Sequence, residues 1–149
     1  MATIFVSDTS GDDSSGDGTQ GSPFKTLFKA CQSRSNGDTI TILDSNTYQP
    51  GLDADNPSGN GRILLNIGLN FVAAEGQTPI ISGAGARASS AATKTAFNCV
   101  NCTSDKVITF QGITFDDFIG SSNTIITANT VGAGGPTQQF TDCTFQNME

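Results

Sequence analysis

The sequence contains no histidine and no tryptophan. Histidine is the commonest general base and transition-metal ligand, so its absence removes most sites of those two kinds. The lack of tryptophan removes the ring best suited to stacking on sugars. Basic residues are also few, because 7 Lys and Arg stand against 14 Asp and Glu and give a net charge of -7. Such a charge repels phosphate backbones and anionic membrane surfaces, so nucleic acid is not expected as a partner.

Long apolar runs are missing as well. No run approaches the roughly 20 residues that a membrane-spanning helix needs, and residues 1–5 lack the basic region and apolar core of a signal peptide. The protein therefore either stays inside the cell or has lost a leader.

The length of 149 residues suits one domain. Asn101 begins an N-glycosylation acceptor pattern, which has a meaning only in a secreted protein.

The first part of the chain predicts a strand, a loop and a helix. Residues 3–7 are typical of a short strand, and a polar loop follows. Apolar residues then recur at i, i+3, i+4 and i+7, which predicts a helix over residues 23–33 with Ser22 as its N-cap. After a turn at residues 36–38, alternation and β-branching over residues 39–43 indicate a strand.

The remaining sequence consists of short apolar segments separated by Gly, Asn, Ser and Asp, without another helical period. Apolar and polar residues alternate over residues 65–73, which predicts one strand, and residues 79–83 predict the next. Small residues dominate between residues 83 and 93. We expect this stretch to be an exposed loop.

The most informative pattern is a repeat with a spacing of 30 residues. Residues 110–117 and 140–147 superimpose, with two phenylalanines and one threonine identical. An apolar strand precedes each copy, at residues 96–100 and 124–128. Strands that recur in this way without a helix between them predict a solenoid, because each turn buries its apolar face only by stacking on the next.

A solenoid makes specific predictions about neighbours. With rungs about 4.8 Å apart, Phe110 would stack on Phe140, and Phe115 would stack on Phe145. Three threonines of the same strands would face outward: Thr109, Thr114 and Thr144. The inward position of Ile108 is matched by Gln138, so the repeat is imperfect.

Several short motifs together resemble a known family. They lie at residues 5–7, 18–19, 22–26, 37–40, 69–71 and 108–115. With these motifs the chain resembles the N-terminal part of pectin-lyase-like right-handed parallel β-helix proteins. Its ending at 143–147 looks like the Phe-x-x-Asn repeat of polymorphic outer-membrane and related surface β-helix proteins. The resemblance implies an all-β, single-stranded right-handed parallel β-helix with an N-terminal capping α-helix, residues 1–36 forming the cap and residues 37–149 about four coils.

The Asp- and Gly-rich stretch before the helix has the residue types of a calcium loop. Asp13, Ser15, Asp17 and Gly18 match the first half of an EF-hand loop. The match then fails, because Phe24 occupies the position of the bidentate glutamate and a strand replaces the entering helix. The sequence favours the alternative that these residues form turns through side-chain to backbone hydrogen bonds. No cofactor is required, and Ca²⁺ is the cofactor that the pattern allows.

Asp116 and Asp117 are the candidates for catalysis, because paired carboxylates suit glycoside cleavage when they flank the bond. Polysaccharide hydrolases of the family that the chain resembles carry adjacent aspartates. Its lyases use Ca²⁺ and a basic residue, for which Lys106 is the candidate near these aspartates in the expected geometry. In the repeat, however, the two aspartates align with Gln146 and Asn147, which favours a turn between coils.

The four cysteines permit disulfides without requiring them. Cys99 and Cys102 have no second pair to complete a metal site, and in an extended strand residues three apart point to opposite sides. A bridge from either one to Cys143 stays open. Cys31 lies on the apolar helix face and Cys143 at the position of Ile113 in the repeat, so both are expected in the core.

These patterns favour a non-catalytic structural or adhesive β-helix module of an extracellular or cell-surface protein or filament. An uncovered last coil would leave backbone donors and acceptors unpaired, so we expect further chain, another copy or a non-sequential segment to cover it. Two alternatives stay open. One is the N-terminal coils of a Ca²⁺-dependent polysaccharide lyase or a glycoside hydrolase acting on acidic polysaccharide. The other is a glycan-binding module without catalysis.

Overall fold

The computed structural model describes residues 1–50, 63–83, 96–100, 102–118, 125–129 and 135–148. These residues form a parallel β-solenoid of about three turns with one short helix. Along the chain, the elements are β1 (Thr3–Val6), α1 (Leu27–Gln32), β2 (Thr39–Ile42), β3 (Thr47–Tyr48), β4 (Ile63–Leu65), β5 (Leu69–Ala73), β6 (Ile80–Ser82), β7 (Phe97–Val100), β8 (Val107–Gln111), β9 (Thr114–Asp116), β10 (Ile126–Asn129), β11 (Thr137–Thr141) and β12 (Thr144–Gln146).

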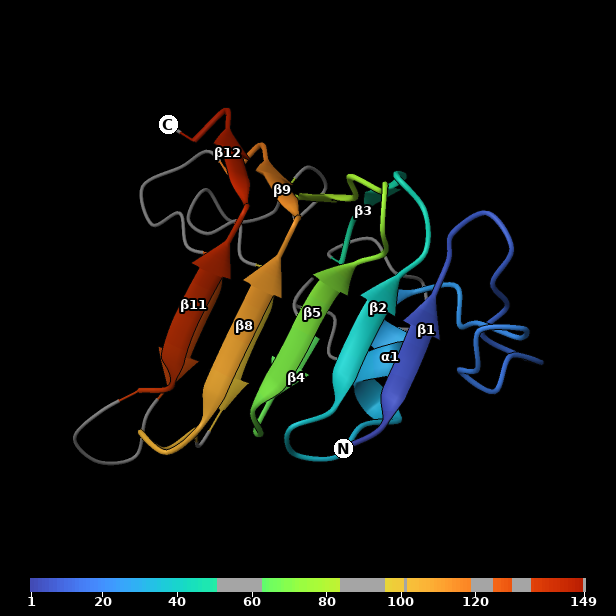
Figure 1. The fold of residues 1–149 in the computed structure, drawn as a ribbon. Helices are drawn as coiled ribbons and strands as arrows, with labels where there is room; N and C mark the ends of the chain where they lie inside the picture. The colour runs from blue at the N-terminus through green and yellow to red at the C-terminus, as the bar shows by residue number, and fades with distance from the viewer. Residues whose placement is uncertain (51–62, 84–95, 101, 119–124, 130–134, 149) are drawn as a thin grey trace, which may run out of the picture.

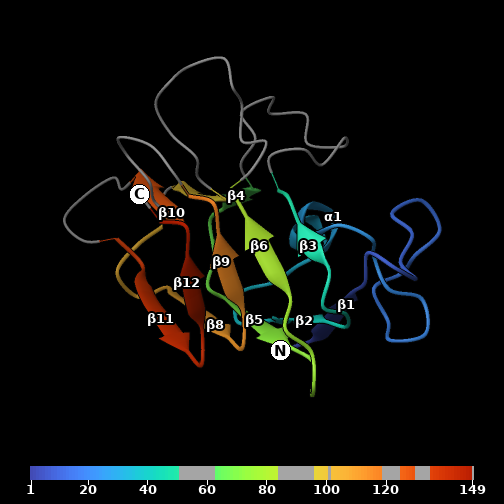
Figure 2. The same cartoon turned by 90° about the horizontal axis from the view of Figure 1, so that it is seen from above.

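The strands form three parallel sheets around one core. Their orders are β1-β2-β5-β8-β11, β10-β7-β4 and β12-β9-β6-β3. Figure 1 looks onto the five-stranded sheet, and Figure 2 shows the four-stranded sheet with its strands side by side. Each complete turn gives one strand to every sheet: β2-β3-β4, β5-β6-β7 and β8-β9-β10. β11 and β12 belong to a further turn. The expectation of an all-β parallel solenoid is confirmed.

Phenylalanine rings stack through the core along the solenoid. Phe71, Phe110 and Phe140 stack with centroid separations of 5.0 and 5.3 Å, each at 12°. Phe115 stacks on Phe145 at 5.5 Å and 15°, and it contacts Phe110 edge to face at 5.2 Å. Such contacts add to the stabilisation from burial. The two predicted stacked pairs are therefore confirmed.

The 30-residue repeat is the register of the last two turns. Strand β8 pairs with β11 from Val107↔Thr137 to Gln111↔Thr141, and β9 pairs with β12 in the same offset. The three threonines predicted to face outward are half-buried or exposed, while their strand neighbours Phe110 and Phe115 are fully buried. The structure also shows where the repeat is imperfect: Gln138 is exposed, and its register partner Ile108 is buried.

The corners of the solenoid explain why the repeat carries Gly, Asp and Asn. Gly112 has φ 70° and Asp142, at the same corner one turn later, has φ 52°. At the next corner Asp117 has φ 57° and Asn147 has φ 51°. Among residues other than glycine, Asp and Asn adopt this left-handed conformation most readily. The identity of these residues is thus a requirement of the turns.

The helix begins four residues later than its sequence pattern predicts. It covers Leu27–Gln32, and Thr26 is its N-cap, with the Thr26 hydroxyl accepting from the Lys29 backbone N–H at 3.1 Å. Ser22 is not the cap. The reason is tertiary: Phe24 forms a parallel β-bridge with Val6, which keeps the preceding residues extended. The apolar face is buried as expected and packs against β1 and β4.

The prediction of one strand over residues 65–73 is wrong, because the chain turns a corner within it. Leu65 ends β4 and Leu69 begins β5, which belong to different sheets. Gly68 lies at this corner, where an added Cβ would come within 2.7 Å of the Val107 carbonyl oxygen. The expected strands at 39–43 and 79–83 are present as β2 and β6. Most of the expected loop at 83–93 lies outside the described residues.

Candidate functional site

The opening loop uses the carboxylates proposed for calcium as hydrogen-bond acceptors. One Asp13 oxygen accepts from the backbone N–H groups of Lys25 and Thr26 at 2.7 and 3.0 Å, and the other accepts from the Thr26 hydroxyl at 2.7 Å. Asp17 accepts from the backbone and hydroxyl of Thr19 at 2.9 and 2.7 Å. The two side chains therefore hold the loop and the start of α1.

Ser15 also belongs to this set of turns. Its backbone N–H donates to Asp12 at 3.0 Å, next to a 2.7 Å bond from the backbone of Ser14. Backbone hydrogen bonds of this kind lower the pKa of Asp12, and those from Thr19 lower the pKa of Asp17. In the part of the chain that the structure describes, no three acidic or cysteine side chains gather where they could hold a metal. The calcium site stays a prediction.

The same loop covers the outer edge of β1. The backbone N–H groups of Phe5 and Ser7 donate to the carbonyls of Gly18 and Phe24, both at 2.9 Å, and Phe24 donates back to Phe5 at 3.0 Å. Gly18 has φ 80° and lies so close to the Phe24 ring that a Cβ would come within 2.7 Å of it. Sequence reasoning missed this closure, because it depends on residues that are distant from β1 in the chain.

A polar network fixes the loop to the end of β2. Asp44 accepts from the hydroxyls of Tyr48 and Ser7 at 2.7 and 2.8 Å and from the backbone of Thr9 at 3.1 Å. Burial raises the pKa of Asp44, but these hydrogen bonds outweigh it, so the pKa lies below its ordinary value. Burial and the bond to Asp44 raise the pKa of Tyr48. The network holds the loop in place. The sequence signal for it is the single tyrosine, whose hydroxyl needs a hydrogen-bond partner when the ring is buried.

The structure places the two catalytic candidates at a corner of the solenoid. Asp116 ends β9, and its carboxylate accepts from the side-chain amide of Asn147 at 2.7 Å. Asp117 follows in the left-handed conformation. Their position fits the expected turn between coils. Their catalytic role stays a prediction.

Lys106 lies directly before β8 and is separated from Asp116 by the whole of β8 and a corner. Its ammonium group pairs with Asp105 at 2.7 Å. The hydrogen bonds from Lys106 and then from Thr103 lower the pKa of Asp105 to about 2. Because its nearest acidic partner is its chain neighbour, Lys106 is not brought together with the two aspartates of the corner.

The cysteines differ from the expectation. Cys99 and Cys102 form a disulfide with a Cα separation of 5.6 Å, so the idea that they point to opposite sides is wrong. The reason is that β7 ends at Val100, and Cys102 lies beyond the strand. A bridge to Cys143 is excluded by this pairing. Cys143 packs partly buried against the core and Cys31 is buried in it, as predicted.

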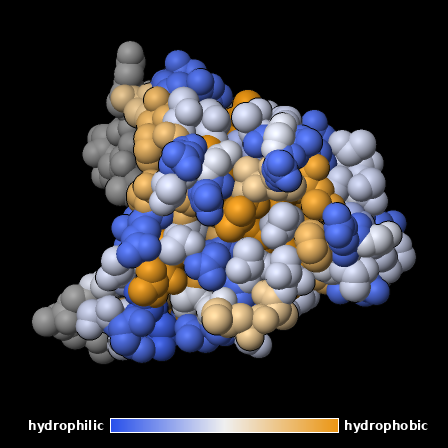
Figure 3. Space-filling view, viewed as in Figure 1, coloured by the Kyte–Doolittle hydropathy of each residue, from blue (hydrophilic) through white to orange (hydrophobic). Residues whose placement is uncertain are grey.

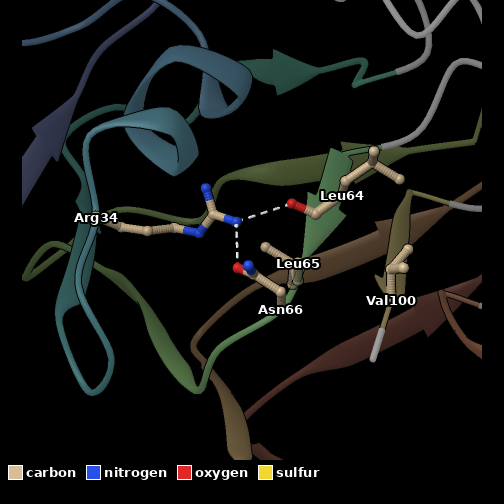
Figure 4. A pocket seen from close by; sticks show the side chains of 5 residues that line it. All are labelled: Arg34, Leu64, Leu65, Asn66 and Val100. Atoms are coloured by element: carbon tan, nitrogen blue, oxygen red, sulfur yellow. Dashed lines mark hydrogen bonds between the residues drawn. The ribbon is translucent and has the colours of Figure 1, made fainter. Parts of the chain in front are cut away.

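A pocket of about 270 Å³ lies between the segment after α1 and the sheet of β4 and β7 (Figure 4), lined by Arg34, Leu64, Leu65, Asn66 and Val100. The Arg34 Nη2 donates to the Leu64 carbonyl at 2.9 Å and to the Asn66 side chain at 3.3 Å. Its Nε is buried without an acceptor among the described residues. The arginine thus ties the helix end to β4.

The outer face of the five-stranded sheet is a further surface that sequence reasoning did not find. In register, one row of outward positions is Thr3, Thr39, Asn70, Thr109 and Gln139. The neighbouring row is Phe5, Thr41, Val72, Gln111 and Thr141. Figure 3 looks onto this face and shows hydrophilic and intermediate residues with small hydrophobic patches between them. Below, these two rows are called the row face.

The opposite edge of the solenoid from β1 is open. Every residue of β11 and β12 is exposed. Phe140 and Phe145, the last rings of the two stacks, are 37% and 48% exposed, and Met148 is 40% exposed. No strand among the described residues pairs with the outer side of β11 or β12.

Comparison of the chain with protein-family models, with curated proteins and with solved structures finds no match. Asn101, the glycosylation candidate, lies outside the described residues. No helix in the described ranges is long and apolar enough to span a membrane.

Proposed function

We propose that the chain is a non-catalytic structural or adhesive module of an extracellular or cell-surface protein or filament. In this proposal the solenoid is a right-handed β-helix of the pectin-lyase-like kind, and α1 is its N-terminal cap. The buried apolar face of α1 and its packing against β1 and β4 support the role as a cap. In this proposal the module requires no cofactor, and Ca²⁺ is the ion that the opening loop would take.

The observation that carries the proposal is the contrast between the two ends of the stack. The outer edge of β1 is hydrogen-bonded to the chain's own loop. In contrast, β11 and β12 are exposed, and they carry the last rings of the two stacks, Phe140 and Phe145. Exposed strand edges with apolar side chains pair readily with further strands. We therefore propose that another copy of the chain stacks on this edge.

The disulfide supports a location outside the cytosol. Cys99 and Cys102 are both buried and paired. Structural disulfides persist in oxidising compartments and are rare where glutathione and thioredoxin keep thiols reduced. An extracellular or cell-surface position accounts for this pair directly.

The enzymatic alternative has less support. A lyase would need a base near a carboxylate cluster, and Lys106 is paired with Asp105 instead of Asp116 or Asp117. The chain is also strongly acidic, with a net charge of -7, which disfavours an anionic polysaccharide. Unsaturated product released from polygalacturonate, and abolished by Asp116→Ala, would favour the enzyme over the module.

The stacking edge is tested by sedimentation velocity over a range of protein concentrations. We expect the chain to self-associate through β11 and β12, and we expect Phe145→Glu to abolish association because it places a charge on the exposed ring stack. Thr144→Glu is the matched control, since Thr144 is exposed on the same strand without contributing to the ring stack. A wild-type chain that stays monomeric at every concentration would overturn the stacking proposal.

A further inference from the structure

The row face carries no charged side chain at its outward positions. All 14 acidic and 7 basic residues of the chain lie elsewhere. Its polar positions are threonine, asparagine and glutamine instead. A surface of this kind offers hydrogen bonds without attracting or repelling charged partners.

Side chains in part of the row face are held by hydrogen bonds to each other and to the backbone before any ligand binds. The Thr109 hydroxyl donates to the Asn70 side-chain oxygen at 2.8 Å, and the Asn70 amide donates to the Gly37 carbonyl at 3.2 Å. Threonine is also restricted at χ1 by its branched Cβ. Groups that are already fixed lose little conformational freedom on binding. The Thr109–Asn70 pair can therefore act as a rigid polar array, flanked by the exposed amides of Gln111 and Gln139.

Apolar groups lie beside this array. Phe5 and Val72 are half-buried in the neighbouring row, and Val107 at the start of β8 is 40% exposed. The row face is thus amphipathic on a short length scale, with hydroxyl and amide groups next to hydrocarbon. A neutral pyranose chain has the complementary character, since its ring faces present C–H groups and its edges present hydroxyls.

The size of the row face excludes a stable protein partner on its own. Five strands about 4.8 Å apart and four or five residues long, at about 3.3 Å per residue, cover roughly 19 by 13–16 Å, or about 250–300 Å². A specific protein interface needs about 800 Å² from each partner. An area of this size suits a few sugar residues, and weak single contacts gain strength when copies act together.

We propose that the row face binds a neutral polysaccharide. The rigid Thr109–Asn70 array and the amides of Gln111 and Gln139 bind sugar hydroxyls, and Phe5 and Val72 contact C–H faces of the rings. Acidic polysaccharides are disfavoured, because the face supplies no cation to them and the whole chain is acidic. This inference rests on the adhesive role proposed above and is independent of stacking at β11 and β12.

The test is co-sedimentation of the whole chain with insoluble cellulose and, separately, with chitin, compared with soluble polygalacturonate in a gel-shift assay. We expect binding to a neutral polymer and none to polygalacturonate. Gln111→Glu should weaken binding about tenfold, because an unpaired carboxylate must be desolvated against a neutral surface. Gln20→Glu changes the same group and the same net charge in the opening loop, where Gln20 is exposed, and should bind normally.

Two further variants separate this inference from the stacking proposal. Thr109→Val keeps the branched shape and removes the hydroxyl that donates to Asn70, so it should reduce binding while the chain stays folded, with only a small fall in its melting temperature. Phe145→Glu should lose self-association and keep its affinity for the polymer. The inference is overturned if neither cellulose nor chitin binds, if binding favours polygalacturonate, or if Gln111→Glu and Gln20→Glu bind alike. In each of these cases self-association still reports on the stacking edge by itself.

Discussion

The two edge strands of the five-stranded sheet have outer sides of opposite kind. On β1, backbone groups of Phe5 and Ser7 are bonded to the loop at Gly18 and Phe24. On β11, every residue is exposed, and the end of the ring stack at Phe140 stays 37% exposed. In Figure 1 these strands lie at opposite sides of the sheet. One edge is thus closed by the chain itself, while the other is open to a further strand.

The forces at the two edges differ as well. Around β1, ionised carboxylates hold the backbone: Asp38 accepts from the backbone N–H groups of Ala2 and Ser35, and Asp44 accepts from the loop. These bonds to Ala2 and Ser35 lower the pKa of Asp38. Around β11 and β12, stacked rings dominate. Acid should therefore lower the stability of the closed edge, and removing an apolar side chain should lower the stability of the open edge.

The largest effect is expected in the ring stack. Phe110→Ala should lower the free energy of unfolding by about 3–5 kcal/mol, because Phe110 is fully buried and contacts rings above and below it. Phe145→Ala should cost only about 1 kcal/mol, since Phe145 is 48% exposed at the open edge. Urea denaturation measures both, with Phe110→Leu as a milder control. Equal losses for Phe110→Ala and Phe145→Ala would mean that β12 is already covered.

The disulfide should come next. Cys99 and Cys102 lie between the two edges, and a cross-link that closes so short a loop contributes about 2 kcal/mol. Reduction with dithiothreitol should lower the stability of the whole solenoid by about that amount without changing the contrast between the edges. Urea denaturation with and without reductant checks this. A selective loss of structure at one edge on reduction would contradict it.

Acid should weaken the closed edge. The pKa of Asp44 is lowered in the folded chain, so its contribution to stability is present above the unfolded value of about 3.9 and is lost as the pH falls through the folded value. Asp44→Asn should therefore cost about 1 kcal/mol at pH 7, a modest figure because the site is partly exposed. The difference from wild type should shrink below about pH 4. A difference that is independent of pH would show that the charge of Asp44 is unimportant.

Calcium should have the smallest effect. The Asp13 and Asp17 oxygens already accept hydrogen bonds from their own loop and from the start of α1. Titration with CaCl₂ should leave the melting temperature unchanged, as it should with MgCl₂ as the control for ionic strength. A saturable rise with calcium alone, abolished by Asp17→Asn, would establish the site that the sequence pattern allowed.

Much of the architecture could be predicted from the sequence, because the last two turns repeat the same residues. The match of Phe110 with Phe140 and of Phe115 with Phe145 gave the parallel stacking directly, and the structure has the same register. The left-handed corner at Asn147 explains why Asn and Asp recur there. A repeat is visible in a single sequence only where turns have equal length.

The rest depended on contacts that no local pattern contains. Apolar and polar residues keep alternating over residues 65–73 although the chain turns a corner there. Alternation alone could therefore not show that these residues belong to two strands, β4 and β5. The N-cap moved to Thr26 because Phe24 pairs with β1. The row face stayed hidden since the register steps from Thr39 to Asn70, Thr109 and Gln139 are 31, 39 and 30 residues. Unequal connections between turns remove the repeat from the sequence while the rows persist in space.

Residue-resolved hydrogen exchange tests the contrast between the edges most directly. The measurement compares the chain at low concentration with its assembled form. We expect the amides of Phe5 and Ser7 to be protected in both, because the loop accepts their hydrogen bonds. We expect amides of β11 and β12 on the side away from β8 and β9 to exchange rapidly at low concentration and to become protected on assembly. Rapid exchange of these amides in the assembled form would contradict the stacking edge, and rapid exchange at Phe5 and Ser7 would contradict the closed one.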